Sequence, residues 1–247
     1  MAGAGSRFAL AGYLVPKPLI TVHNVEMIRI VIDNIRPTQA HRFIFVCQRA
    51  HIVAFGLAEK LATWAPGCLV VSIDKQTRGA AETVLAAAEF IDSDEPLMIA
   101  NSDQYVVADI DEYLAAANAS GVDGLIMTMQ ATDPKWSYIG RSGGLVDRVV
   151  EKEVVSDEAT VGIYNFASGA DFVSAARSMI EREEFSQGEF YVAPTYNALI
   201  AAGRRIETFT VGNEASGMYG LGIPSDLDLF AATNVSRRAV QAINAHS

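Results

Sequence analysis

The sequence has few of the features that mark secreted and membrane proteins. Its 247 residues include two cysteines, Cys47 and Cys68, which is too few for a disulfide-supported secreted domain. Both lie in apolar stretches, so we expect buried, reduced thiols. No apolar run reaches the ~18 residues of a membrane helix. Residues 1–20 carry Gly, Arg and Lys where a signal peptide would be apolar. We expect a cytoplasmic protein without membrane insertion.

Positive charge and metal-binding patterns are also scarce. The chain has 19 Lys and Arg against 29 Asp and Glu, a formal net charge of −10. A general DNA or RNA binder usually has the opposite sign, so we expect no nucleic acid partner. The four histidines have neither the spacing nor the cysteine partners of a zinc site. The absence of a G-x-S-x-G motif argues against an α/β hydrolase.

What the sequence does contain is an alternation of β-rich and helical segments. Half of the residues are apolar and 19% are charged, which predicts a folded domain with a sizeable core. The alternation in the first half predicts parallel strands with helices on both faces, and the second half is richer in strands. The expected strands are 42–47, 68–73, 96–101, 124–130, 138–140, 145–152 and 161–166. The expected helices are 54–64, 79–91, 169–182, 190–202 and 225–243.

Two short stretches near the start suit the binding of a phosphate chain. GAGSRF holds Gly3 and Gly5, but it matches neither the dinucleotide fingerprint nor the P-loop. Lys17 lies between Pro16 and Pro18, and flanking prolines fix the backbone that presents its ammonium. Taken singly, these stretches also fit an ordinary glycine turn and a surface lysine.

Taken together with four later stretches, they resemble a known family. The stretches are KQTRGAAETVLAA (75–87), IANSDQY (99–105), VEKEVVSDEATVGIYNF (150–166) and GLGIPSDLDLF (220–230). With the G-x-G-[ST]-R signature followed by P-K-P, the series resembles the sugar-phosphate nucleotidyltransferases. The resemblance spans residues 1 to about 230. It is closest to the short, glucose-1-phosphate thymidylyltransferase-like enzymes of surface-polysaccharide loci.

The resemblance implies a fold and a reaction. The fold would be α/β: a three-layer α/β/α Rossmann-like arrangement of GT-A type with a mixed, mainly parallel central sheet. A glycine phosphate loop normally follows a strand. Here no residues are available for it, so we expect a truncated start or a fold without its first strand. We expect one domain over 1–247, with a nucleotide-binding half (1–125) and an acceptor-binding half (126–247). The reaction would join an NTP to a sugar phosphate, or to a similar phosphorylated small molecule, and release pyrophosphate.

The resemblance also implies roles for individual residues. Asp103 follows an apolar strand at the edge where open α/β sheets bind ligands, so a carboxylate there would hold Mg²⁺. The catalytic group would be Arg7, Lys17 and Asp103. The nucleotide would contact Gly3, Ala4, Gly5, Ser6, Gln76, Gly79 and Asn101. The acceptor would contact Glu151, Lys152, Gly162 and Tyr164.

One departure from the family pattern bears on activity. Many members carry a second metal aspartate where this chain has Gly220, and Ile223 replaces the threonine of the following turn. Asp226 is near but out of register, and at a helix start it also suits a cap. Two alternatives therefore stand beside the nucleotidyltransferase: a GT-A type glycosyltransferase that uses a nucleotide sugar, and a non-catalytic nucleotide-binding paralogue. Glu189 and Tyr191 suit either closure of the acceptor site or a contact in a homo-oligomer.

Overall fold

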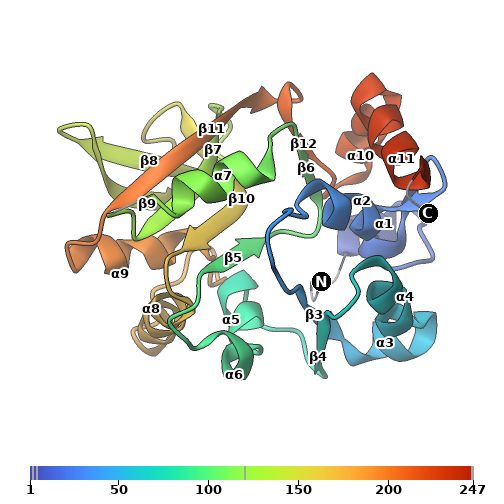
Figure 1. The fold of residues 1–247 in the computed structure, drawn as a ribbon, viewed down its shortest axis with the longest axis horizontal. Helices are drawn as coiled ribbons and strands as arrows, with labels where there is room; N and C mark the ends of the chain where they lie inside the picture. Colours follow the sequence, from blue (N-terminus) through green and yellow to red (C-terminus); the bar gives the residue numbers. More distant parts are fainter. Residues whose placement is uncertain (2, 4, 120, 246–247) are drawn as a thin grey trace. The chain divides into compact units, whose positions relative to one another are not determined.

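The alternating apolar segments form an α/β structure in the computed structural model, which describes residues 1, 3, 5–119 and 121–245. The chain divides into two compact units, each built from separate stretches of sequence (Figure 1). The first unit comprises Met1–Gln76, Asn101–Ile110 and Glu214–Ser247, and the second comprises Thr77–Ala100 and Asp111–Asn213. The α/β class is confirmed. The expected single domain with halves at 1–125 and 126–247 stays a prediction.

The first unit contains three short strand pairs. β3 (Ile44–Gln48) and β4 (Leu69–Ile73) are parallel, and they lie side by side in Figure 1. β1 (Thr21–Val22) pairs antiparallel with β2 (Val25–Glu26), and β6 (Gln104–Val106) pairs antiparallel with β12 (Gly217–Gly220). The helices of this unit are α1 (Ser6–Leu10), α2 (Met27–Asn34), α3 (Arg49–Phe55), α4 (Leu57–Trp64), α10 (Pro224–Ala232) and α11 (Asn234–Ala245), with a 3-10 turn at Lys17–Leu19.

The second unit is built on a larger sheet with the strand order β11-β7-β10-β8-β9, and β5 also pairs with β10. β11 runs parallel to β7, whereas β10 pairs antiparallel with β5, β7 and β8. The strands are β5 (Leu97–Ala100), β7 (Gly124–Gln130), β8 (Ser137–Ser142), β9 (Leu145–Glu151), β10 (Glu158–Phe166) and β11 (Ile206–Glu214). The helices are α5 (Ala80–Leu85), α6 (Ala88–Ile91), α7 (Ile110–Ala117), α8 (Gly169–Glu181) and α9 (Tyr196–Ala201), with a 3-10 turn at Ala193–Thr195.

Burial explains why these segments form these elements. In β7, six consecutive residues of GLIMTMQ are buried, as expected for a strand that is covered on both faces. α2 buries five of its eight residues, Met27, Ile28, Ile30, Val31 and Ile32. Cys47 is also fully buried, and this burial raises the pKa of its thiol to about 11. Cys68 is half-buried, and both thiols are free. No helix within the described residues is long and apolar enough to cross a membrane.

Three expected helices are interrupted in the structure. Gly56, with φ 59°, separates α3 from α4 within the segment expected at 54–64. The segment expected at 79–91 breaks at Ala86 and Ala87, whose amides bond three residues back rather than four. Thr233 is extended and separates α10 from α11. The expected segments did not include α2, α7, β11 or β12.

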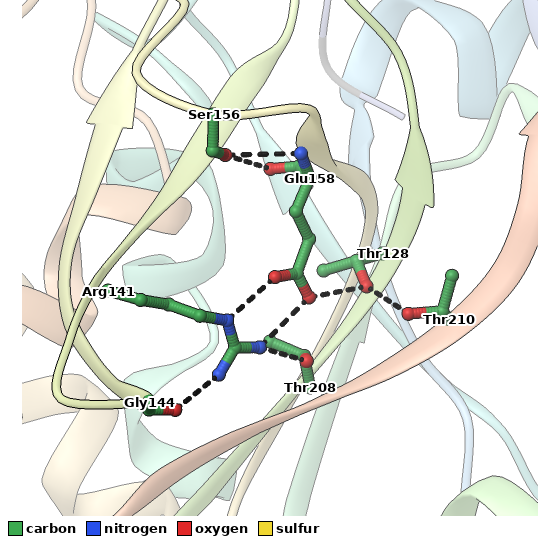
Figure 2. Close-up of polar contacts among 7 residues, drawn as sticks. All are labelled: Thr128, Arg141, Gly144, Ser156, Glu158, Thr208 and Thr210. Carbon is green, nitrogen blue, oxygen red and sulfur yellow. Dashed lines mark hydrogen bonds and ion pairs between the residues drawn. The ribbon is translucent and has the colours of Figure 1, made fainter.

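A polar network ties the strands of the second unit together at one end of the sheet (Figure 2). The Arg141 guanidinium donates to both carboxylate oxygens of Glu158, at 2.9 and 3.1 Å, and to the Thr208 hydroxyl at 2.7 Å. Thr128 donates to Glu158 Oε1 at 3.1 Å and shares a further hydrogen bond with Thr210. The network therefore joins β7, β8, β10 and β11 through charge-assisted bonds.

Glu158→Gln should destabilise the protein by about 1–2 kcal/mol at neutral pH, because the amide replaces an acceptor of two guanidinium bonds. Burial alone would raise the pKa of Glu158, but the bonds from Arg141 and its hydroxyl neighbours hold it below 4.5. A carboxyl whose pKa is lower in the folded than in the unfolded protein stabilises the folded state at pH values above its unfolded pKa. This stabilisation is lost as the pH falls through the folded pKa. Urea unfolding should show the Glu158→Gln deficit at pH 7 and a smaller deficit below pH 4. Asp92→Asn, which removes an exposed ion pair with Arg177, should cost less than about 1 kcal/mol at either pH.

Candidate functional site

The glycine signature forms a tight turn into α1. Gly5 has φ 60°, a left-handed conformation that suits glycine, and its carbonyl accepts from the amides of Phe8 and Ala9. A Cβ at Gly5 would lie 3.7 Å from Lys17 Cβ, so the turn and the lysine are neighbours. Ala4 lies outside the described residues. Ser6 and Arg7 begin α1 with exposed side chains.

The two prolines fix the backbone around Lys17. Pro16 is extended, at φ −62° and ψ 147°, and Pro18 is buried within the 3-10 turn that Lys17 begins. The Lys17 side chain is left partly exposed, at 22%. Its ammonium donates to Asp103 Oδ2 at 2.5 Å. The sequence placed both residues in one catalytic group, and the structure brings them into direct contact.

Asp103 is held by its neighbours on both sides. It directly precedes β6, and its carbonyl accepts from Leu221 N at 2.8 Å, at the end of the β6–β12 pair. Asn34, at the end of α2, bonds both main-chain groups of Val106 at 2.8 Å and so anchors β6. A Cβ at Gly222 would come within 3.0 Å of Asp103 Oδ2. The glycine therefore leaves the room that this carboxylate occupies.

A cavity of about 220 Å³ lies beside the glycine turn and Lys17. Gly3, Gly5 and Lys17 line it together with His51, from α3. Burial lowers the pKa of His51, and its Nδ1 is buried without a hydrogen-bond partner among the described residues. Sequence reasoning considered His51 for a zinc site alone and missed this position. No spacing pattern pointed to it, because α3 and the glycine signature are far apart in the chain.

The Asp103 carboxylate is of the ligand type that Mg²⁺ prefers. No group of three or more His, Cys, Asp and Glu side chains that could hold a metal occurs in the described part of the chain. Mg²⁺ commonly uses one or two carboxylates and takes waters and substrate phosphates as further ligands. Asp103 is 24% exposed and can supply such a carboxylate. A Cβ at Gly220 would lie 3.3 Å from Asp226 Oδ2, so the Asp226 carboxyl lies beside the position of the missing second aspartate.

The remaining predicted nucleotide contacts differ in their surroundings. Gln76 follows β4 and is exposed, and Asn101 is exposed ahead of Asp103. Gly79 precedes α5 with φ 139°, and a Cβ there would lie 2.4 Å from the Phe190 carbonyl oxygen. Only glycine fits this close approach of two backbones. The conformation and the contact explain the residue type without reference to a ligand.

The predicted acceptor residues gather around the end of β9 in the second unit. Glu151 ends β9, and the Ser137 hydroxyl donates a short hydrogen bond to its carboxylate. Burial raises the pKa of Glu151 above 4.5. Lys152 follows with φ 57°, a conformation uncommon for a residue other than glycine, and its Nζ donates to the Tyr191 hydroxyl at 2.5 Å. Glu151 and Arg148 also line a cavity of about 560 Å³ between β9, α8 and α9.

Gly162 and Tyr164 lie on β10, beside this cluster. Gly162 has φ 83°, within the register shift between Thr160 and Tyr164, so it forms a bulge that re-aims the strand. The Tyr164 side chain is buried, and its hydroxyl is paired with Thr160 at 3.0 Å. Burial raises its pKa well above 10. This environment is that of a core tyrosine, so an acceptor contact by Tyr164 stays a prediction.

Comparison with known proteins identifies the family. A sequence model described as Nucleotidyl transferase matches residues 1–202. The chain belongs to this family. None of the curated proteins matches the chain.

Solved structures support the same assignment. The nucleotidyltransferase chain is similar to the nucleoside-diphosphate-sugar pyrophosphorylase of Vibrio cholerae RC9, with 25% identity and a TM-score of 0.77; the match covers 94% of this chain and 98% of the other. It also shares the fold of the inositol-1-phosphate CTP transferase of T. maritima, with 16% identity, a TM-score of 0.73 and coverage of 97% and 92%. The Rossmann-like nucleotidyltransferase fold expected from the sequence is thereby confirmed.

The environment of Glu151 leads to a pH-dependent prediction. A carboxyl whose pKa is higher in the folded than in the unfolded protein stabilises the folded state at pH values below its unfolded pKa. This stabilisation is lost as the pH rises through the folded pKa. Glu151→Gln keeps an acceptor for Ser137 and removes the ionisation. The variant should therefore gain stability relative to wild type between pH 4 and pH 8 in urea unfolding experiments. Glu181→Gln, at an exposed position of α8, should show no such trend. A constant difference across this range would contradict the burial argument.

Proposed function

We propose that this nucleotidyltransferase joins an NTP to a sugar phosphate, or to a related phosphorylated small molecule, with release of pyrophosphate. The observation that carries the proposal is the ion pair of Lys17 and Asp103, with the lysine beside the glycine turn at Gly5. An ammonium and a magnesium-binding carboxylate at a glycine turn suit a triphosphate. The names of the similar solved structures support the choice of substrates.

In the proposed reaction, a phosphate oxygen of the acceptor attacks the α-phosphorus of the NTP. A new P–O bond forms there, and the bond to the bridging oxygen breaks, so that pyrophosphate leaves with that electron pair. The chemistry needs positioning and charge neutralisation rather than covalent participation by the protein. The turn at Gly3 and Gly5 would cradle the triphosphate, together with the main chain of Ser6.

Three charged residues would act on the phosphates. Arg7 would neutralise the β- and γ-phosphates, because a guanidinium binds two oxygens at once. Lys17 would contact the α-phosphate and the incoming acceptor phosphate with its compact ammonium. Asp103 would hold Mg²⁺, and a bound Mg²⁺ would screen the charge of the triphosphate and of the departing pyrophosphate.

The remaining proposed contacts are with the nucleoside or with the acceptor. Gln76, Gly79 and Asn101 would contact the nucleoside. Glu151 and Lys152 would bind the acceptor, whose phosphate the Lys152 ammonium would attract. The product would be an activated precursor for surface polysaccharide. A cytoplasmic location and a homo-oligomeric state belong to the same proposal.

A pyrophosphate-release screen tests the proposed function. Four common NTPs and dTTP are crossed with sugar 1-phosphates and small phosphorylated metabolites, with and without Mg²⁺. One magnesium-dependent hit would establish the reaction and both substrates, and would show that Gly220 is tolerated. Release of free sugar from a nucleotide sugar, without pyrophosphate, would favour the glycosyltransferase. Nucleotide binding by calorimetry without turnover on any acceptor would favour a non-catalytic paralogue, for which Gly220 is the specific indication.

Lys17→Ala should lower kcat about 10²–10³-fold, because a charge that stabilises the transition state is removed. It should lower the free energy of unfolding by less than about 1 kcal/mol, as for other partly exposed ion pairs. Lys60→Ala is the matched control, because Lys60 forms a partly exposed ion pair with Glu26 in the same unit, at 2.9 Å. Steady-state kinetics and urea unfolding of both variants check the prediction. Equal kcat values for the two variants would contradict the role of Lys17.

A further inference from the structure

The segment 186–191 makes a tight turn ahead of the 3-10 turn at Ala193–Thr195. Ser186 and Glu189 bond each other through their main chains at 3.0 Å in both directions. Between them, Gln187 and Gly188 have φ 49° and 81°. Two consecutive residues with left-handed backbone conformation form a tight hairpin turn, and the two main-chain hydrogen bonds close it. The turn therefore fixes the direction in which the chain continues. Tyr191 follows two residues after Glu189 in this constrained stretch.

Two side chains from this segment contact the Lys152 ammonium. Tyr191 Oη lies 2.5 Å from Lys152 Nζ, and Gln187 Oε1 lies 3.2 Å from it. The Lys152 amide donates to the Trp136 carbonyl at 3.0 Å, so the lysine is fixed at its backbone as well as at its tip. The conformation of Lys152 at φ 57° is unfavourable for a side chain of this kind. These contacts offset that cost.

Both of these contacts are with uncharged groups. Glu151 and Glu189 act on the Lys152 ammonium through their charge, and Tyr191 and Gln187 hold it by hydrogen bonds. A phenol and an amide are uncharged, so they orient the ammonium of Lys152 and leave its positive charge in place. The hydrogen bond that Lys152 donates to the Tyr191 hydroxyl is the largest influence on the Lys152 amine and raises its pKa. The amine is therefore held protonated and in one position.

The same segment is attached to the residues around Gly79. Phe190 N donates to the Arg78 carbonyl at 2.8 Å, and Ala81 N donates to the Phe190 carbonyl at 3.0 Å. The Arg78 guanidinium lies over the Phe190 ring, 4.9 Å from its centroid. The backbone of Phe190 is thus fixed on both sides of Gly79. Because Tyr191 is the next residue, its hydroxyl is presented from a rigid support.

We infer that Tyr191 is a positioning residue, which acts through Lys152 to bind the phosphate of the acceptor substrate and is itself supported by the pairing of Phe190 with residues 78–81. The inference rests on the proposed function for the identity of the ligand. Of the two locations that the sequence left open for Tyr191, the acceptor site and a contact in a homo-oligomer, it favours the acceptor site.

The test is Tyr191→Phe, which removes one hydroxyl and keeps the ring. With the acceptor found in the screen, its KM should rise about tenfold, the effect of one charge-assisted hydrogen bond. The KM for the NTP should stay within about twofold of wild type, because no nucleotide contact is touched. Tyr113→Phe is the matched control, since the Tyr113 hydroxyl lies in the same unit and donates to the Leu125 carbonyl at 2.7 Å. That variant should leave both KM values unchanged.

A second measurement does not depend on activity. Acylation of the Lys152 amine, followed by peptide mass spectrometry across pH, reports the protonation of that one side chain. In Tyr191→Phe the labelling curve should move to lower pH, because the variant lacks the hydroxyl whose hydrogen bond most favours the ammonium. Gln187→Asn serves if Tyr191→Phe does not fold. The shorter asparagine side chain removes the hydrogen bond between position 187 and the Lys152 ammonium. Asparagine also tolerates the left-handed backbone conformation of that position.

The outcomes separate the inference from the proposed function. A shifted labelling curve in a protein that turns over no acceptor would overturn the proposed substrates and the acceptor role, and would keep the positioning of Lys152. Turnover with labelling curves and KM values equal to those of Tyr113→Phe would keep the proposed function and overturn the inference. An equal rise in both KM values would also overturn it, since that pattern indicates a general structural defect.

Discussion

The contact of Lys17 with Asp103 is the interaction on which the candidate catalytic site depends. Its two partners are far apart in the chain, and each is fixed by a different device. Prolines constrain the lysine, and the β6–β12 pair holds the aspartate. An ammonium and a carboxylate in contact, both only partly exposed, avoid the cost that either charge would have alone. The pair therefore keeps two reactive charges together in the protein before a substrate arrives.

The second unit uses buried carboxylates in two opposite ways. Glu158 is surrounded by the Arg141 guanidinium and threonine hydroxyls, which stabilise its charge (Figure 2). Glu151 has one serine donor, and burial dominates its environment. The arrangement around Glu158 is typical of a charged residue that stabilises a sheet by linking its strands. The arrangement around Glu151 keeps a carboxyl in an unfavourable setting, as is frequent where a side chain serves binding or catalysis.

Sequence reasoning located the α/β class and the principal strands, and it placed Lys17 and Asp103 in one catalytic group. It did not predict that these two side chains are in contact. The strands could be predicted because they are short apolar runs bounded by turn residues, as in β3, β4 and β7. Helix boundaries were harder to predict, because the backbone conformation of one residue, Gly56 or Thr233, interrupts a helix that the sequence pattern presents as continuous. β11 was missed although IETFTVGNE alternates. The position of His51 beside the glycine turn depends on tertiary packing, which no local pattern encodes. The contact of Tyr191 with Lys152 arises in the same way, from segments 39 residues apart.

The close approach of Gly79 to Phe190 has a consequence for engineering. The family resemblance places position 79 among the groups that read the base, which makes it an obvious target for changing nucleotide preference. Three backbone atoms of Phe190 occupy the space that any side chain there would need. A randomised library at this position would consequently return misfolded variants rather than new specificities. Diversity aimed at the base is better introduced at Gln76, whose side chain is exposed and free of such crowding.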